Sequence, residues 1–523
     1  MSAPQGTAAP RALVLGASGY VGSNLVPWLV ARGYRVRAAS RRLDALQARG
    51  WRGVELCATD ALDAASLDHA LQGVDIAFYL VHSMAAGAGF PLLDRHAATK
   101  FRDAAARAGV QRIVYLGGLQ PGGRTSTHLA SRGETGDILR AGPVPVTELR
   151  AGVIIGPGSA AFEIIRDLVF HLPAMVTPRW VSSRSQPVAL ADVLADLEQL
   201  ARLPQAAGAT YDTGGPEVLT YREMMLQFGE LVGRRPLIVP VPVLTPQLSS
   251  YWLDLVTAVP TNVARALIDG LEHDVLADDG PLRALLPRTL TNYRDAARAA
   301  FEAERTAFAV VEGMAPAEPP EPTEAQVAEV DAGTAGAPAP TPPPAGSGRW
   351  TEGSMLYRRH RPDFAFYAKH MRGEAVAAAP AAALWDVVSA IGGDNGYYFL
   401  DALWKLRGRL DQIAGGTGMS RGRRHPQQLE IGDVVDFWRV VALEPGHRLT
   451  LIAEMRLPGA ASLGFEVQPL GERRSRVVIT AAFHPAGVKG LLYWHSLTPA
   501  HALIFPGLAR EITRRAERAS RRR

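Results

Sequence analysis

The feature that most constrains this chain is a glycine-rich turn between an apolar run and a helical pattern. Residues 12–15 are all apolar, and the sequence GASGYVG follows them directly. Gly16 permits a tight turn, and Gly19 lets backbone N–H groups approach a pyrophosphate at the positive end of the helix. Gly22 allows the helix to pack close to the strand. The sequence therefore predicts a strand, a turn and a helix that together bind a diphosphate.

The alternation of apolar runs and helical stretches continues well beyond this turn. The runs lie at residues 11–18, 34–40, 54–60, 75–83, 112–118 and 144–152. Helical patterns such as residues 96–109 separate several of them. Such runs are typical of parallel strands that are buried on both faces, because helices cover each side of the sheet. We therefore expect an α/β fold with a doubly wound parallel sheet.

A change in composition divides the chain after this region. Pro, Ala, Gly and Glu dominate residues 314–348, where large apolar side chains are almost absent. Such a segment buries too little surface to offset the entropy lost on ordering, so we expect a disordered linker. The expected parts are a nucleotide-binding domain at 11–312, the linker at 313–349 and a second domain at 350–523.

The second domain has a different order of elements. A strand and an amphipathic helix at residues 374–392 precede several runs that resemble antiparallel strands, and a long helix is expected from about Leu497. Asp436 and Trp438 are expected to share one face of a strand. The basic segment 415–426 is interpreted as a hairpin loop, with a binding site for a phosphate or acidic head group as the alternative. This order indicates an α+β fold whose antiparallel sheet wraps a helix and encloses a cavity for a small apolar ligand.

Composition and charge exclude several classes of protein. The single cysteine, Cys57, excludes internal disulfides and cysteine-rich metal sites. His484, His495 and His501 are too scattered to indicate a metal site. The 56 basic and 51 acidic residues give a formal charge of only +5, and part of it lies in the terminal RRAERASRRR, which is interpreted as a solvated helix end. We therefore expect no bound metal and no nucleic-acid partner.

The chain lacks the patterns of a secreted or membrane-spanning protein. The opening residues, MSAPQGTAAP, have no signal-peptide pattern, and no run of about eighteen apolar residues occurs. The nearest candidate, residues 490–508, contains two prolines and two histidines. It fits a buried amphipathic helix better, with peripheral contact at a membrane surface as the alternative. We expect a cytoplasmic protein, and the sequence makes no prediction of its oligomeric state.

Residues near the glycine turn favour a particular dinucleotide. About twenty residues after the turn, where an NAD-selective site carries Asp or Glu, the sequence is ASRR. Arg41 and Arg42 can pair with a 2′-phosphate, so NADP is expected, with NAD as the alternative. Asp60 is interpreted as an acceptor for the adenine amino group or as a helix N-cap. The expected coenzyme-binding residues are Gly16, Ser18, Gly19, Tyr20, Val21, Gly22, Arg41, Arg42, Asp60, Ala61, Leu80, Val81 and His82.

Together, the glycine turn and two later segments resemble the atypical and extended short-chain dehydrogenase/reductase superfamily, especially NmrA-like proteins and relatives of the complex I 39-kDa subunit. The later segments are LRAGVIIGPGS (149–159) and QPVALADV (186–193), and the resemblance covers about residues 11–310. Behind it, FAFYAKHMRGEAV, RGRRHPQQLEIGDVVDFWRV and AEMRLPG resemble the DUF2867 family. That family is similar to helix-grip folds of the START and polyketide-cyclase type. The resemblance implies a Rossmann-type first domain and a ligand-binding second domain.

The resemblance also implies a catalytic Tyr, a Lys four residues later and a Ser, and this sequence departs at all three positions. They hold His128, Arg132 and Gly117–Gly118. Histidine can act as a general acid or base, whereas arginine stays protonated and can hold a ribose. The alternative for His128 is a helix-start residue with no role in proton transfer. Ser126 or Thr127 as the hydroxyl, and Tyr115 or Glu134 as the acid or base, are further alternatives.

Three functions fit these patterns, and the sequence alone leaves enzymatic activity undecided. The first is an NADP-dependent oxidoreductase acting on an apolar small molecule that the second domain helps to hold. The second is a dinucleotide-binding sensor or assembly factor without turnover, which the loss of all three catalytic groups favours. The third is a lipid or isoprenoid carrier that the first domain regulates.

Overall fold

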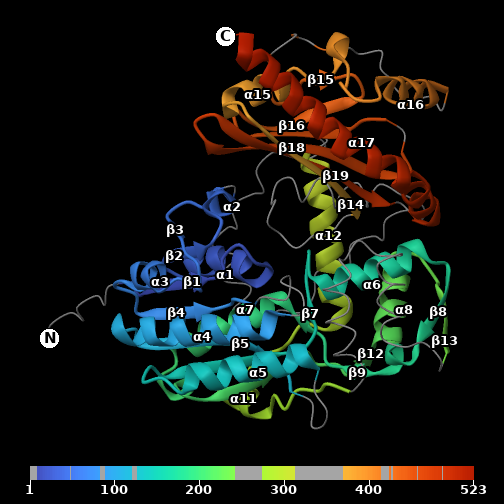
Figure 1. Cartoon of the computed structure of the whole chain (residues 1–523). Coiled ribbons are helices and arrows are strands. Elements are labelled where there is room, and N and C mark those ends of the chain that lie inside the picture. The colour runs from blue at the N-terminus through green and yellow to red at the C-terminus, as the bar shows by residue number, and fades with distance from the viewer. Residues whose placement is uncertain are drawn as a thin grey trace. The chain divides into compact units, whose positions relative to one another are not determined.

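The computed structural model describes most of the chain (Figure 1). The described residues are 9–47, 49–82, 89–120, 126–241, 274–311, 369–413, 418, 423, 425, 428–455, 457–485 and 487–522. They fall into two compact units, one ending at Val311 and the other beginning at Lys369. The predicted linker, 313–349, lies outside the described residues, so the domain boundaries around it stay predictions.

The first unit is built on a seven-stranded parallel sheet. Its strand order is β11-β6-β5-β4-β1-β2-β3, and every neighbouring pair runs parallel. The strands are β1 (Arg11–Leu15), β2 (Arg35–Ser40), β3 (Glu55–Ala58), β4 (Ile76–Tyr79), β5 (Arg112–Gly118), β6 (Val146–Ala151) and β11 (Thr210–Thr213). The order reverses between β1 and β4, and in such sheets the crevice at the reversal receives the ligand. The predicted doubly wound parallel sheet is confirmed.

Helices cover both faces of this sheet, as the alternation of side chains along the strands requires. In β1, Val14 belongs to one buried core and Leu13 to the other. Residues of α1 and α7 complete the first core, and residues of α3 and α4 complete the second. The helices are α1 (Tyr20–Ala31), α2 (Leu43–Gln47), α3 (Ala64–Leu71), α4 (Phe90–Arg107), α5 (Thr127–Arg140) and α7 (Leu190–Arg202).

Shorter elements follow the sheet in this unit. Two of the added strand pairs are parallel, β7 with β10 and β8 with β13, and β9 pairs antiparallel with β12. These strands are β7 (Ile154–Ile155), β8 (Ala174–Pro178), β9 (Arg184–Ser185), β10 (Val188–Ala189), β12 (Leu219–Thr220) and β13 (Leu237–Val241). The added helices are α6 (Ala160–His171), α8 (Tyr221–Leu231), α11 (Gly280–Leu285) and α12 (Tyr293–Val311), with 3-10 turns at Arg179–Ser182 and Pro204–Ala206.

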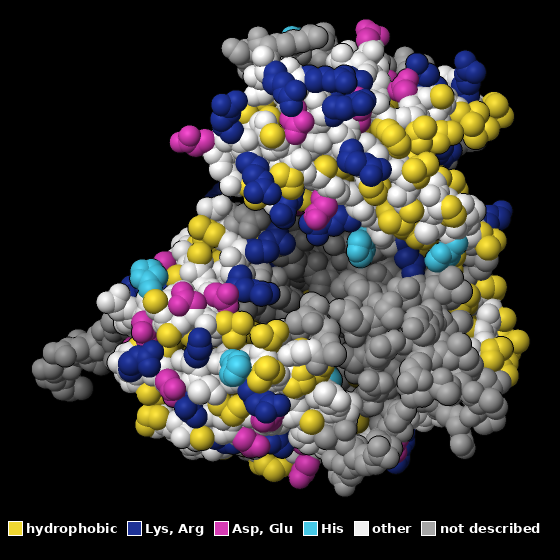
Figure 2. Space-filling model, in the orientation of Figure 1, with side chains coloured by type: hydrophobic (Ala, Val, Ile, Leu, Met, Phe, Trp, Pro, Cys, Tyr) yellow, Lys and Arg dark blue, Asp and Glu magenta, His cyan; other side chains and the backbone are white. Residues whose placement is uncertain are grey.

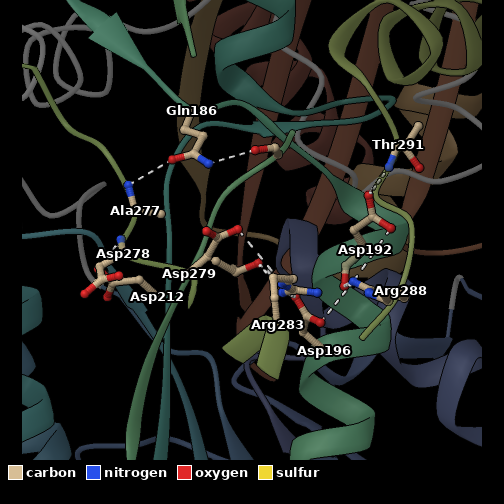
Figure 3. A network of polar contacts seen from close by, with 12 residues as sticks. Gln186, Asp192, Asp196, Asp212, Ala277, Asp278, Asp279, Arg283, Arg288 and Thr291 are labelled. Atoms are coloured by element: carbon tan, nitrogen blue, oxygen red, sulfur yellow. Dashed lines mark hydrogen bonds and ion pairs between the residues drawn. The ribbon is translucent and has the colours of Figure 1, made fainter. Parts of the chain in front are cut away.

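A buried ionic network attaches the segment after residue 274 to α7 (Figure 3). Arg283 and Arg288 approach the two carboxylate oxygens of Asp196 at 2.7 and 3.0 Å. The Asp196 side chain is wholly buried. The neighbouring Asp192 accepts a hydrogen bond of 2.9 Å from the Thr291 backbone N–H. The second segment on which the family resemblance rests, QPVALADV, therefore begins α7 and supplies one of the two anchoring carboxylates.

The second unit contains a six-stranded antiparallel sheet in the order β14-β19-β18-β17-β16-β15. Its strands are β14 (Lys369–Ala377), β15 (Val434–Val435), β16 (Trp438–Glu444), β17 (Arg448–Ala453), β18 (Gly459–Gly471) and β19 (Arg474–Pro485). Its helices are α15 (Ala381–Ser389), α16 (Asp401–Ile413) and α17 (Gly487–Arg522), with a 3-10 turn at Gly393–Asn395. Side chains of the sheet, α15 and α17 form one core, among them Phe465, Leu384 and Ile512. The predicted α+β class is confirmed.

Three expectations for this unit need correction or addition. The long final helix begins at Gly487 rather than near Leu497, and it runs through Pro499 and Pro506 because it packs along β14 and β19. Asp436 and Trp438 do not share a strand face, because Asp436 has a φ of 55° and lies in the turn between β15 and β16. Helix α16 was not predicted.

The basic segment 415–426 lies mostly outside the described residues. Its Arg423 donates a hydrogen bond of 2.7 Å to the carbonyl oxygen of Ile391, which gives this cation a structural role. No helix in the described ranges is long and apolar enough to cross a membrane.

Candidate active site

The turn after β1 has the backbone geometry that its first glycine was expected to provide. Gly16 has a φ of +93°, and a Cβ at this position would lie 2.9 Å from the carbonyl oxygen of Leu80. The backbone N–H groups of Gly16 and Ala17 both donate to the carbonyl oxygen of Ala39, at 3.0 and 3.1 Å. These bonds tie the turn to the end of β2, and the contact with Leu80 places it against the end of β4. The turn therefore lies at the reversal of strand order.

The other two glycines leave the start of α1 accessible. A Cβ at Gly22 would lie 2.4 Å from the Gly16 carbonyl oxygen, so only glycine lets the helix approach the turn this closely. Gly19 is the N-cap of α1, and no side chain of the described residues caps the helix there. Uncapped N–H groups at a helix N-terminus favour an anion. The Gly16 turn and the start of α1 together form a site, here called the coenzyme cradle, that fits the diphosphate of a dinucleotide.

Hydroxyl and guanidinium groups surround the end of β2. The hydroxyl oxygens of Ser18 and Ser40 are 2.8 Å apart, and the Arg42 backbone N–H donates to Ser40 Oγ at 3.3 Å. The side chains of Arg41 and Arg42 are exposed. Arg49 donates to the Ser18 carbonyl oxygen at 3.3 Å, which brings in a third cation that the sequence analysis missed. Two of these arginines directly follow β2, and the third reaches the glycine turn from the end of α2.

The end of β3 provides Asp60 and Ala61. The Asp60 carboxylate accepts a hydrogen bond of 2.9 Å from the Leu62 backbone N–H, in a turn of the chain. Asp63 caps α3 by accepting from the Ala65 N–H at 3.2 Å, so Asp60 is not the N-cap of that helix. Asp60 is exposed and Ala61 is buried.

His82 and His128 form the centre of a buried hydrogen-bonded chain. Nε2 of His82, just after β4, lies 2.8 Å from Nδ1 of His128, in the first turn of α5. On its other side, Nδ1 of His82 lies 2.8 Å from the carboxylate of Asp94 on α4. Asp94 is 3% exposed and also accepts a hydrogen bond of 3.0 Å from Ser131 Oγ. The chain therefore runs from Asp94 through His82 to His128.

The hydrogen bonds assign the tautomers of both rings. A carboxylate can only accept, so Nδ1 of His82 carries a proton and its Nε2 accepts. His128 must then donate through Nδ1, which leaves a lone pair on Nε2. Burial lowers the pKa of His82, although the hydrogen bond that His82 donates to Asp94 raises it, and burial lowers the pKa of His128 to about 3. Both rings are therefore uncharged near neutral pH, and Nε2 of His128 is a proton acceptor.

Arg132 lies one helical turn after His128. Its guanidinium donates to the carbonyl oxygen of Leu116, and a Cβ at Gly118 would lie 3.4 Å from the Arg132 side chain. The same Cβ would lie closer to Leu129, at 3.1 Å, so the side chains of α5 pack against this glycine. Nε of Arg132 is buried and has no hydrogen-bond partner among the described residues. The same guanidinium adds to the lowering of the pKa of His128.

The alternative acid or base groups have other roles. Burial raises the pKa of Tyr115 to about 12, and its hydroxyl donates to the Arg132 carbonyl oxygen at 2.8 Å. Glu134 pairs with Arg95 at 3.3 Å in an exposed position. Ser126 caps α5 by accepting from the Leu129 N–H, and Thr127 is exposed. Among the candidate acid and base groups, His128 therefore has the only described chain of buried partners.

Sequence matches assign two known families to these two units. Residues 16–142 match a family model described as NAD(P)H-binding, and residues 365–508 match DUF2867, a protein family of unknown function. The chain is 32% identical over 232 residues to the (4-alkanoyl-5-oxo-2,5-dihydrofuran-3-yl)methyl phosphate reductase of Streptomyces griseus, over 42% of this chain and 74% of that protein. The chain belongs to the short-chain dehydrogenase/reductase superfamily.

Another curated protein matches a shorter part of the chain, and solved structures resemble the fold of its first unit. Sterol demethylase protein B of Methylococcus capsulatus is 34% identical over 125 residues, which cover 22% of this chain and 38% of that protein. The NADPH-dependent quinone oxidoreductase of Escherichia coli is 19% identical, with a TM-score of 0.47 over 56% of this chain and 99% of that chain. Triphenylmethane reductase of Citrobacter sp. is also 19% identical, with a TM-score of 0.46 over 55% and 99%.

Proposed function

We propose that this protein is an NADPH-dependent oxidoreductase of an apolar small molecule, in which His128 transfers the proton. The observation that carries this proposal is the buried chain Asp94–His82–His128, since it gives His128 a hydrogen-bonded partner through which a proton can pass. His82, the middle residue of these three, follows two residues after Leu80, whose carbonyl oxygen lies against the Gly16 turn. The proton path and the coenzyme cradle therefore share the end of β4.

The residues of the first unit fit a bound nicotinamide dinucleotide. The N–H groups at Gly19 and the start of α1 would hold the diphosphate, and Arg132 would contact the ribose. Arg41, Arg42 and Arg49 would pair with a 2′-phosphate, and ASRR supplies no carboxylate to repel it, which favours NADPH over NADH. A bound NADPH supplies the hydride that reduces a carbonyl carbon and leaves as NADP⁺.

The uncharged pair becomes an acid when the two rings take up one extra proton from water. With that proton, His82 donates to Asp94 through Nδ1 and to His128 through Nε2, and His128 carries its proton on Nε2. The carbonyl oxygen takes this proton and completes the alcohol. A proton then moves from Nε2 of His82 to Nδ1 of His128, which restores the uncharged pair. Until the proton is transferred, the buried carboxylate of Asp94 stabilises the positive charge on His82.

The names of two relatives support a substrate with a hydrocarbon part. One name specifies an alkanoyl group on a molecule that also carries a phosphate, and the other specifies a sterol. The competing function is a dinucleotide sensor or assembly factor without turnover, which the loss of Tyr, Lys and Ser favours. The two functions make opposite predictions for turnover and the same prediction for coenzyme binding.

The test measures NADPH oxidation by absorbance, with ketones, enones and quinones that carry alkyl chains as candidate substrates. We expect turnover that His128→Ala abolishes while NADPH still binds. His96→Ala is the matched control, because His96 is an exposed histidine on α4, the helix that carries Asp94. Tight NADPH binding without turnover across the panel would favour the sensor. Equal turnover in His128→Ala and the unchanged protein would exclude His128 as the proton donor.

A further inference from the structure

The second unit contains a cavity that the proposed proton chemistry does not use. Its volume is about 270 Å³, and α16, α17 and strands β16 to β19 line it. Aromatic side chains form part of the wall, among them Trp404, Phe483 and Trp494, and the rings of Phe483 and Trp494 stack at 5.7 Å. Most of the remaining lining is leucine and alanine. A wall of this kind favours hydrocarbon.

Three lining residues carry a buried nitrogen without a described hydrogen-bond partner: Trp404, Trp438 and His501. The indole nitrogens can only donate, so His501 is the member of this set that can also accept. The His501 ring lies between Trp494 and Phe505, with ring centroids 5.2 and 5.4 Å apart. Its Nδ1 is buried and makes no hydrogen bond to the residues that the structure describes. Burial also lowers the pKa of His501, so its ring is uncharged near neutral pH. An uncharged imidazole without a partner can accept or donate one hydrogen bond inside the cavity.

The mouth of the cavity lies along α16. Leu403, Leu406 and Leu410 line the cavity and are 42, 52 and 51% exposed, so the wall continues to the surface here. Figure 2 shows hydrophobic side chains gathered over α16 and the N-terminal part of α17, at the upper right of the view. Arg407 also lines the cavity, and its guanidinium lies 5.5 Å from the centre of the Tyr493 ring. A charged group of a ligand would therefore meet a partner at the rim.

We propose that this cavity binds an uncharged molecule that is mostly hydrocarbon and carries one hydroxyl or carbonyl group, which pairs with Nδ1 of His501. An apolar cavity of about 150 Å³ is enough for benzene, so the present volume holds roughly a dozen carbon atoms. A charged head group deep inside the cavity is disfavoured, because the charged side chain among the described lining residues, Arg407, lies at the rim. Binding requires no coenzyme, so this inference is independent of the proposed oxidoreductase.

The experiment uses the full chain and measures displacement of the fluorescent probe N-phenyl-1-naphthylamine. The competing ligands are 1-decanol, decane and decyl sulfate, which differ only in the end group. We expect saturable displacement with 1-decanol as the tightest of the three. Decyl sulfate that binds as tightly as 1-decanol would overturn the proposal, because its head group would then lie at Arg407.

Two variants test the position of the ligand. His501→Phe keeps an aromatic ring but removes the hydrogen-bonding atom, so the affinity for 1-decanol should fall about two- to tenfold while that for decane is kept. His447→Phe, at an exposed histidine in the turn before β17, is the matched control. Ala500→Phe fills space in the cavity wall and should weaken both ligands. Unchanged affinities in both cavity variants would overturn the proposal, whatever NADPH oxidation shows.

Discussion

His82 and His128 are joined ring to ring by a hydrogen bond of 2.8 Å, although 46 residues separate them in the chain. The contact exists because the end of β4 and the first turn of α5 meet beside the glycine turn. It gives His128 a buried partner, and through that partner a carboxylate. A lone histidine at the start of a helix would have neither.

Asp94→Asn tests whether the carboxylate fixes the tautomers of the two rings. An amide can donate to Nδ1 of His82, which would reverse the direction of both hydrogen bonds in the chain. We expect kcat to fall by about 10²- to 10⁴-fold with NADPH binding kept, because general acid catalysis contributes about that much. The measurement is NADPH oxidation with the best substrate of the panel. A kcat equal to that of the unchanged protein would show that Asp94 only supports α4.

The low pKa of His128 predicts a pH dependence of stability. Its folded pKa of about 3 lies below its ordinary value of 6.5, and the pKa of His82 is lowered in the same direction. Between these two values the unfolded chain binds protons that the folded chain does not, so the free energy of unfolding decreases as pH falls below about 6.5. In His128→Gln this decrease should be smaller. His96→Gln is the control, and equal slopes of Tm against pH in both variants would contradict the prediction.

Gly19→Asp tests the coenzyme cradle directly. The new Cβ would lie 3.2 Å from the Gly16 carbonyl oxygen, and the carboxylate would occupy the place of the diphosphate at the start of α1. We expect NADPH binding to be lost in calorimetric titration. The control is Ala31→Asp, which adds the same charge at the exposed far end of the same helix. NADPH affinity that survives Gly19→Asp would show that the dinucleotide binds elsewhere.

How much of this site was predictable depends on the distance between its parts in the sequence. The glycine turn is local, so its spacing alone predicted a φ that glycine favours at Gly16. The spacing of His128 and Arg132 also predicted one helical face. Asp94 was missed, since its contact with His82 depends on how α4 packs, and no local pattern encodes that. Helix α16 was missed because its leucines are exposed and Gly408 interrupts its helical pattern.

The proposed preference for NADPH rests on the three arginines at the end of β2 and beyond α2. In the double variant Arg41→Ala/Arg42→Ala, the affinity for NADPH divided by that for NADH should fall about tenfold or more. The reason is that two charge-assisted hydrogen bonds to the 2′-phosphate are lost. Adding Arg49→Ala should lower this affinity ratio further. Arg52→Ala, an exposed arginine on the same connection, is the control. A ratio that is unchanged by all three substitutions would exclude these side chains from the selectivity.

The network between α7 and the segment after residue 274 should contribute strongly to stability. Asp196→Ala leaves Arg283 and Arg288 partly buried without their shared carboxylate, and breaking a buried pair costs about 3–5 kcal/mol. The matched control is Glu230→Ala, which removes an exposed pair with Arg294 at 3.3 Å and should cost less than about 1 kcal/mol. Chemical denaturation followed by circular dichroism measures both. If the two variants lose equal stability, the network does not anchor the segment, because water would then satisfy the two arginines as well as Asp196 does.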